Sequence, residues 1–214
     1  MKRIIFLLVI FSIICYFQYN YINKNNNSYE ILQYENPNKS IFENMLNDRL
    51  ISIFTDINLE LKTDLNIYPN ASSKDKSNIE KDLLQNINYY AIPFCLKTSL
   101  QINFYNKDQK IHLNKVSSYR NLIYQYKGTR RLFLFSPNQK NNLYSKNINQ
   151  IDFWNQNTDR FPLLKNAKYI EIILRENQMI YIPMNWYYAS ICDDECITIF
   201  YLTESIFSAF LKRK

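Results

Sequence analysis

The sequence predicts a mainly β protein, an antiparallel sandwich or barrel preceded by two helices and an apolar amino-terminal anchor. Short segments rich in β-branched and aromatic residues follow one another after Tyr90, two helix-start signals precede them, and an apolar run opens the chain. With 214 residues, of which 47% are hydrophobic, the chain is long enough for one domain with a substantial core.

The first element is the apolar run at residues 4–17, IIFLLVIFSIICYF, which reaches residue 22 if two polar residues are included. A helix rises about 1.5 Å per residue, so about 20 residues cross a hydrocarbon core of about 30 Å. We therefore expect residues 1–22 to form an uncleaved transmembrane signal-anchor. The alternative is a cleaved signal peptide, although no small-residue cleavage site follows the run. Lys2 and Arg3 favour a single-pass membrane protein with a cytosolic amino terminus and a lumenal or exterior carboxy-terminal domain.

The polar segment at residues 23–39 contains a proline and is typical of a linker, so we place a single domain at residues 40–214. At the other end of the chain, ESIFSAFLKRK is typical of a short amphipathic helix. Such a helix offers a surface for a protein partner or for a homodimer.

Two helices are expected at the start of the domain. Ser40 and Glu43 form a capping box, and the apolar residues that follow at helical spacing predict a helix over residues 41–55. Ser77 and Glu80 repeat the signal and open a second amphipathic helix.

The strands are expected in the second half of the chain. Gly128 and Thr129 would join two of them as a two-residue hairpin, because glycine adopts the positive φ of such turns without steric cost. Close spacing of short strands is typical of a sandwich or barrel. The predicted strands are residues 99–105, 109–114, 119–127, 130–136, 167–174, 178–182 and 196–202.

Composition excludes several kinds of site. A single histidine cannot supply a two-histidine metal site from one chain, and a single glycine cannot build a glycine-rich phosphate loop. The four cysteines lack zinc-ribbon spacing. The net charge is +7, but five basic residues lie at the extreme ends of the chain, which leaves +2 for residues 4–211. A nearly neutral body does not favour nucleic-acid binding.

The stretch at residues 121–137, NLIYQYKGTRRLFLFSP, resembles a core motif of JmjC/cupin-like proteins. These are the iron- and 2-oxoglutarate-dependent oxygenases of the asparaginyl-hydroxylase type. The resemblance covers about residues 100–202 and implies a double-stranded β-helix, the cupin or jelly-roll barrel, with its core at about 99–202. Further matches follow in the same order at Leu143-Tyr144, Asp152-Phe153, Arg160-Phe161-Pro162 and the segment MIYIPMNW at 179–186.

The same resemblance implies that the iron ligands are absent. The positions of the family's H-x-D pair fall on Lys115 and Ser117, and the second histidine position falls on Tyr188. A cation, a neutral hydroxyl and a phenol do not form the facial triad that holds Fe(II). A rival alignment takes residues 112–114, His-Leu-Asn, as the H-x-D pair, which still lacks the carboxylate and the second histidine. We therefore expect no catalytic residues, no metal and no cofactor.

An anion pocket could survive without iron. The family binds the 2-oxoglutarate carboxylate with a lysine two residues after the hairpin glycine, and here that residue is Arg130. Arginine can bind a carboxylate with two parallel hydrogen bonds. Arg130, with Asn121, is the predicted anion-binding pair. The alternative is a strand arginine that pairs with a local acid or faces solvent.

Cys192 and Cys196 flank an acidic triplet that is typical of a turn, which would bring the two thiols close across a hairpin. They are candidates for a disulfide; proximity without a bond and, more remotely, metal binding are the alternatives. Trp186 and Tyr187 are expected to pack inside the barrel, with ligand stacking as the alternative. His112 is expected to be a polar strand residue rather than a catalytic one.

These observations favour a membrane-anchored, catalytically inactive JmjC/cupin-like domain that acts as a binding or structural module. One alternative is an active 2-oxoglutarate-dependent oxygenase with an atypical metal site. Another is a structural protein of a viral membrane or virion.

Overall fold

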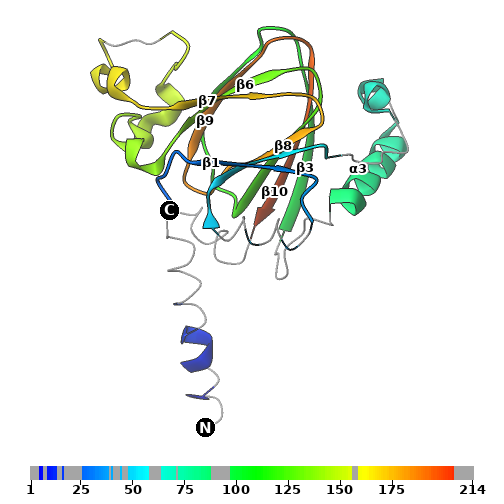
Figure 1. Cartoon of the computed structure of the whole chain (residues 1–214), viewed down its shortest axis with the longest axis horizontal. Coiled ribbons are helices and arrows are strands. Elements are labelled where there is room, and N and C mark those ends of the chain that lie inside the picture. The colour runs from blue at the N-terminus through cyan, green and yellow to red at the C-terminus, as the bar shows by residue number, and fades with distance from the viewer. Residues whose placement is uncertain are drawn as a thin grey trace.

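Figure 1 shows the chain as a computed structural model, in which two β-sheets face each other as a barrel. The structure describes residues 26–38, 48–57, 64–70, 72–87, 97–155 and 159–204, together with residues 5–6, 9–13, 16, 40 and 44. The helices are η1 (Leu65–Asn70), α3 (Ser73–Ile87), η3 (Pro137–Lys140), η4 (Ser145–Gln150) and η5 (Pro162–Asn166). The strands are β1 (Ile31–Glu35), β2 (Ile51–Thr55), β3 (Lys97–Tyr105), β4 (Lys110–Lys115), β5 (Arg120–Lys127), β6 (Arg130–Phe135), β7 (Ile170–Leu174), β8 (Gln178–Tyr181), β9 (Tyr187–Cys192) and β10 (Cys196–Glu204).

The six-stranded sheet has the order β1-β2-β8-β5-β10-β3, and the four-stranded sheet has the order β4-β9-β6-β7. From β3 to β10 the chain changes sheet at every connection except the one between β6 and β7. All pairings are antiparallel apart from β1 with β2. This is the two-sheet barrel that the sequence predicts, and seven of its strands match the predicted segments.

Apolar side chains form three layers around the two sheets. Alternation along β6 shows how: Leu132 and Leu134 point into the barrel, whereas Phe133 and Phe135 lie on the outer side. The outer face of the six-stranded sheet is covered by α3 and η1, with Leu83 fully buried. The outer face of the other sheet is covered by the connection between β6 and β7 (Figure 1).

The amino-terminal half differs from its prediction. Residues 51–55, expected in a helix, form β2, which lies between β1 and β8. Arg49 and Asp56 have positive φ angles of 55° and 56°, so an α-helix cannot continue through them. Hydrogen bonding to strands on both sides replaces the local helical preference. The expected linker at 23–39 is also wrong in part, because it contains β1.

The second predicted helix is confirmed as α3, but it begins at Ser73 rather than after Ser77. Its start is fixed by Ser72, whose Oγ accepts a hydrogen bond from the Asp75 backbone N–H at 3.2 Å. The strand β9 has no counterpart in the sequence prediction.

The turn at Gly128-Thr129 does not close a hairpin. It joins β5 to β6, which lie in different sheets, and the acidic turn at 193–195 likewise joins β9 to β10 across the sheets. Gly128 has a φ of +77°, and a Cβ added there would lie 2.3 Å from the carbonyl oxygen of Glu195. The two turns therefore pack directly against each other, and Gly128 is needed both for its φ and for the lack of a side chain.

Among the residues that the structure describes, no helix is both long and apolar enough to cross a membrane. Most of the predicted anchor at 4–22 lies outside the described residues. So do residues 205–214, which include nearly all of the predicted carboxy-terminal helix.

Candidate functional site

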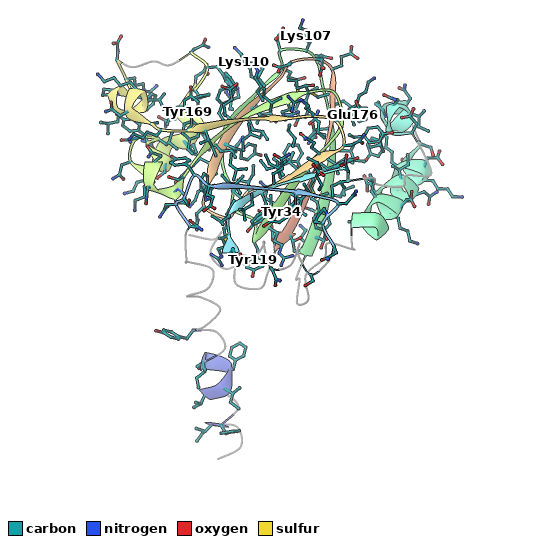
Figure 2. All side chains as sticks on the ribbon, viewed as in Figure 1. Tyr34, Lys107, Lys110, Tyr119, Tyr169 and Glu176 are labelled. Atoms are coloured by element: carbon teal, nitrogen blue, oxygen red, sulfur yellow. The ribbon has the colours of Figure 1, made fainter. Side chains whose placement is uncertain are left out.

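A cavity of about 310 Å³ lies between the two sheets. Strands β3, β4, β5, β9 and β10 contribute to it, together with the connection between β4 and β5. Figure 2 places Lys107 and Tyr119 at opposite ends of the barrel, and the β4–β5 connection lies at the end marked by Tyr119. The lining residues are Gln101, Asn103, Tyr105, Ile111, Asn114, Lys115, Val116, Ser117, Ser118, Asn121, Tyr188, Phe200 and Leu202.

The three positions that the resemblance assigns to iron ligands lie together in this cavity: Lys115, Ser117 and Tyr188 all line it. The pairing of β4 with β9 places Asn114 opposite Tyr188, so these two residues share a face, and it places Lys115 opposite Tyr187 at the end of β4. Two backbone hydrogen bonds of 2.8 and 2.9 Å hold the segment after β4 against the turn before β9. Asn114 of the rival alignment lines the same cavity, so the cavity does not decide between the two alignments.

The chemistry of these three side chains is that of hydrogen-bond donors. Lys115 is exposed and offers an ammonium group, and Ser117 offers a hydroxyl. Burial, assisted by repulsion from Tyr105, raises the pKa of Tyr188 to about 12, although the charge of Arg130 acts in the opposite direction. The Tyr188 phenol therefore stays protonated at neutral pH.

Asn121 is only 3% exposed and lines the same cavity. Within the described part of the chain its Oδ1 has no hydrogen-bond partner. A buried amide without a partner costs free energy unless water or a ligand satisfies it. Asn121 is therefore well placed to contact whatever occupies the cavity.

Arg130 lies inside the barrel, with an exposed fraction of 0%. Its Nη1 donates to Ser190 Oγ at 2.8 Å, whereas Nε and Nη2 have no hydrogen-bond partner among the described residues. The Tyr105 ring lies over the guanidinium, with Cζ 4.2 Å from the ring centroid. The solvent-facing alternative is therefore wrong. The arginine that pairs with acids is its neighbour Arg131, which binds Asp193 at 2.7 Å.

The predicted pair of Asn121 and Arg130 is not brought together in the cavity. Asn121 lines it, but Arg130 does not. Tyr105 contacts both regions, because it lines the cavity and also covers the guanidinium. Tyr105 therefore connects the cavity lining to the guanidinium of Arg130.

His112 is exposed and does not line the cavity. In the rival alignment only Asn114 faces the cavity, and its Nδ2 donates to the carbonyl oxygen of His112 at 2.7 Å. Trp186 and Tyr187 are buried and do not line the cavity. Trp186 packs inside the barrel as expected, whereas Tyr187 packs in the outer layer with Phe135, so its expected place inside the barrel is wrong.

Cys192 and Cys196 are free and buried. Their thiols lie close enough to shift each other's pKa, as the acidic turn predicts, although the two strands do not form a hairpin. A disulfide between them stays a prediction.

The sequence interpretation missed the contribution of β3 to the site. Gln101, Asn103 and Tyr105 alternate along this strand and all face the cavity. Their spacing of two was a usable signal, since one face of a strand carries every second residue. What the spacing could not show is which face of β3 points inward.

The sequence of the chain matches the family model of the cupin-like domain over residues 19–202. The chain belongs to the cupin-like domain family. Its JmjC-like character is supported by JmjC domain-containing protein D of Dictyostelium discoideum, 39% identical over 75 residues, which are 32% of this cupin-like chain and 17% of that relative.

Solved structures similar to this cupin-like chain include the cupin domain of Drosophila melanogaster CENP-C, with 11% identity and a TM-score of 0.33. The similarity covers 49% of this chain and 59% of that domain. A conserved Streptococcus pyogenes protein of unknown function has 8% identity and a TM-score of 0.33, with 50% and 64% of the two chains covered.

The side chains at the cavity do not fit the Fe(II) of JmjC oxygenases. Iron of that class is held by two imidazoles and one carboxylate, which donate lone pairs to the metal. Lys115 carries a positive charge and no lone pair, and the protonated Tyr188 is a poor ligand. Within the described residues no three His, Cys, Asp or Glu side chains gather into a group that could hold a metal ion.

Proposed function

We propose that this cupin-like domain is a binding module for a small carboxylate-bearing molecule and that it does not catalyse an iron-dependent oxygenation. One observation carries the proposal: the three positions that would hold iron instead place an ammonium, a hydroxyl and a protonated phenol on one cavity. Groups that donate hydrogen bonds and carry positive charge attract anions and repel metal cations.

The buried Arg130 supports an anionic ligand. A guanidinium with two unsatisfied nitrogens and no water contact is costly in a folded protein, and a bound carboxylate would satisfy it. Lys115 and Asn121 would meet a ligand that enters the cavity, and Arg130 would be reached once the Tyr105 ring is displaced. A dicarboxylate offers one carboxylate to each of these two groups of residues, so we favour dicarboxylates over monocarboxylates.

The binding part of the proposal is tested by titrating 2-oxoglutarate, succinate and citrate into the purified chain, with heat release and thermal stabilisation as readouts. Saturable binding of at least one dicarboxylate is expected. Absence of binding by all three at millimolar concentration would contradict an anion-binding module.

The catalytic part is tested separately. With Fe(II) and 2-oxoglutarate supplied, we expect no succinate formation and no stoichiometric Fe(II), Mn(II) or Zn(II) by elemental analysis. A triple variant with Lys115→His, Ser117→Asp and Tyr188→His restores the ligand types at positions that share the cavity, and it should take up one divalent metal per chain. Metal-dependent turnover by the unmodified chain would establish the oxygenase alternative.

Membrane attachment through residues 4–22 is a separate part of the proposal. It rests on the length of the apolar run. Carbonate extraction should leave the full-length chain in the membrane pellet. Amino-terminal sequencing that finds a chain starting after residue 20 would instead support a cleaved signal peptide.

A further inference from the structure

Two cysteines and one arginine form a buried cluster at the end of the barrel marked by Lys107. Arg130 lies directly opposite Cys192 in the β6–β9 ladder, and Cys196 lies opposite Tyr105 in the β10–β3 ladder. The exposed fractions of Cys192, Cys196 and Arg130 are 0%, 2% and 0%. Cys196 Sγ lies 3.2 Å from the carbonyl oxygen of Thr129, and the backbone N–H of Asp193, next to Cys192, donates to the same oxygen at 2.9 Å, so both cysteines converge on one turn.

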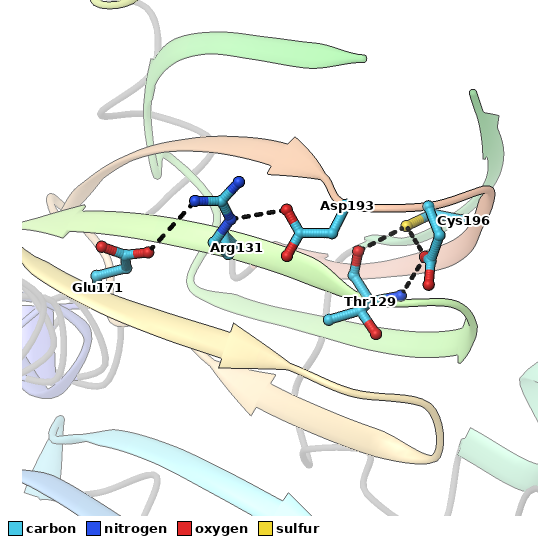
Figure 3. A network of polar contacts seen from close by, with 6 residues as sticks. Thr129, Arg131, Glu171, Asp193 and Cys196 are labelled. Carbon is cyan, nitrogen blue, oxygen red and sulfur yellow. Dashed lines mark hydrogen bonds and ion pairs between the residues drawn. The ribbon is translucent and has the colours of Figure 1, made fainter. Parts of the chain in front are cut away.

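The turn between the two cysteines is fixed on both sides, as Figure 3 shows. Asp193 accepts a hydrogen bond from Arg131 Nε at 2.7 Å, and Asp194 accepts one from the Thr129 backbone N–H at 2.6 Å. The Cys196 thiol donates to the carbonyl oxygen of Thr129 at 3.2 Å. These contacts hold the thiols in place while both are reduced.

The charges around the pair favour one thiolate. The hydrogen bond from Cys192 lowers the pKa of Cys196, burial opposes this, and the Arg130 charge acts in the same direction as the hydrogen bond. The pKa of Cys192 is raised, first by its hydrogen bond to Cys196 and then by burial. Asp194 in the turn opposes thiolate formation, and Tyr105 also faces the pair.

We propose that Cys192 and Cys196 are a redox modification site, at which a small hydroperoxide converts the dithiol into a disulfide and Arg130 stabilises the reacting thiolate. The guanidinium supports this role, because Nε and Nη2 have no hydrogen-bond partner among the described residues and a thiolate beside them would supply an acceptor. The inference shares Arg130 with the proposed carboxylate binding but does not rest on it, because the oxidation is tested without any carboxylate ligand.

The chemistry uses two steps. The Cys196 thiolate sulfur attacks a peroxide oxygen, the S–O bond forms, the O–O bond breaks, and the leaving alkoxide or hydroxide takes up the proton that the thiol released. The Cys192 sulfur then attacks the sulfenic sulfur, the S–S bond forms, the S–O bond breaks, and the hydroxide leaves as water with the Cys192 proton. The dithiol loses two electrons and the peroxide gains them, and an external dithiol reductant reverses the change.

The burial of the sulfur atoms selects the oxidant. The two cysteine residues are at most 2% exposed, so hydrogen peroxide needs a much smaller opening of the barrel end to reach them than a bulky aromatic disulfide reagent does. The native chain should therefore react with hydrogen peroxide and resist the bulky reagent until it is unfolded.

The test uses the full-length chain with Cys15→Ser and Cys95→Ser, so that only the pair remains. Hydrogen peroxide should yield a peptide in which Cys192 and Cys196 are joined with the loss of two hydrogen atoms, and dithiothreitol should restore it. Adding Cys192→Ser should leave Cys196 as a sulfenic acid that a dimedone probe traps. Absence of the disulfide in the folded chain, or independent oxidation of both sulfurs to sulfinic acids, would overturn the proposal.

The contribution of Arg130 is measured by oxidation rate. Arg130→Met should slow disulfide formation about 10-fold, because one unit of thiol pKa changes the thiolate fraction by that factor. Arg130→Lys should retain most of the rate, and Lys127→Met removes a nearby exposed charge as the control. Circular dichroism verifies that each variant is folded. Equal rates for the Met variants at positions 130 and 127 would overturn the role of Arg130.

Discussion

The barrel interior has a cavity end and an Arg130 end, and each carries one cation in a different setting. At the cavity end Lys115 is exposed, so its ammonium keeps water contacts. At the Arg130 end the guanidinium is fully buried and meets one hydroxyl and one aromatic ring. Removal from water strengthens electrostatic attraction and also raises the cost of an unpaired charge. The same charge should therefore contribute much more to anion binding at the Arg130 end.

The Arg130 end is closed by the contact between the turn at Gly128-Thr129 and the turn at 193–195. A substitution at Gly128 should disrupt this contact most strongly. Gly128→Ala should lower the free energy of unfolding by roughly 3 kcal/mol, since a non-glycine residue at positive φ and an overpacked contact each cost about 1–3 kcal/mol. The clash is with the Glu195 carbonyl oxygen, which is backbone and cannot swing away. Urea denaturation measures the change.

The matched control is Lys127→Ala, one residue earlier and exposed. Surface changes of this kind stay within about 0.5 kcal/mol. If both variants lose the same small amount of stability, the two turns do not pack as tightly as the structure shows.

Substitution of Arg130 tests directly whether the buried cation contributes strongly to anion binding. Arg130→Ala should weaken dicarboxylate binding by about 10- to 100-fold, because hydrogen bonds to a charged group contribute roughly 1.5–3 kcal/mol and each 1.4 kcal/mol is a factor of ten. Arg130→Lys should keep part of the affinity, since it retains the charge but loses the planar arrangement of donors. Calorimetric titration of all three proteins measures the effect.

The stability of an Arg130 variant should move in the opposite direction from its affinity. Arg130→Met replaces a buried charge by an apolar side chain of similar length, so the free energy of unfolding should be unchanged or higher. A loss of several kcal/mol in denaturant unfolding would mean that the guanidinium has a partner within the fold, and the unpaired-cation interpretation would be wrong.

Local sequence signals predicted the part of the fold that depends on alternation. The strands from β3 onward were predictable except β9, and so were the two faces of β6, because every second side chain points the same way. The strand β2 was not predictable. Its apolar residues also fit helical spacing, and only pairing with β1 and β8 decides between the two.

The residues of the candidate site were predictable from the sequence. Which of them share one cavity was not. The resemblance gave Lys115, Ser117 and Tyr188, and the structure places all three on one cavity. It could not show that Tyr105 lines this cavity and also lies over Arg130, because that position depends on the pairing of β3 with β10. Register between distant strands is a property of the whole sheet rather than of any one segment.

The pH dependence of the free energy of unfolding tests the burial of Tyr188 at the cavity end. Its pKa is raised by burial to about 12, above the usual value of 10. The folded state therefore holds the phenol proton more tightly than the unfolded state between pH 10 and 12, and stability falls as pH rises through this window. The loss attributable to Tyr188 should be roughly 2 kcal/mol by pH 12, and Tyr188→Phe should remove it. Denaturation curves at pH 8 to 12 measure it, with Tyr169→Phe as the exposed control; equal pH dependence in both variants would contradict it.

Substitution of Lys115 should have the smallest effect on dicarboxylate affinity. The salt dependence of that effect should distinguish the exposed charge at the cavity end from the buried charge at the Arg130 end. Lys115→Ala should weaken dicarboxylate binding about 3- to 5-fold, because a solvent-exposed ion pair contributes roughly 1 kcal/mol or less. Added salt should reduce this contribution, since exposed charges are screened, while the contribution of the buried Arg130 should change little. Titrations of the unmodified chain, Lys115→Ala and Arg130→Ala at low and high salt measure both contributions.

Lys107→Ala, an exposed lysine at the opposite end (Figure 2), controls for general charge attraction. If Lys115→Ala costs as much affinity as Arg130→Ala at high salt, the ligand is held at the cavity end alone and the ranking of the two ends is wrong.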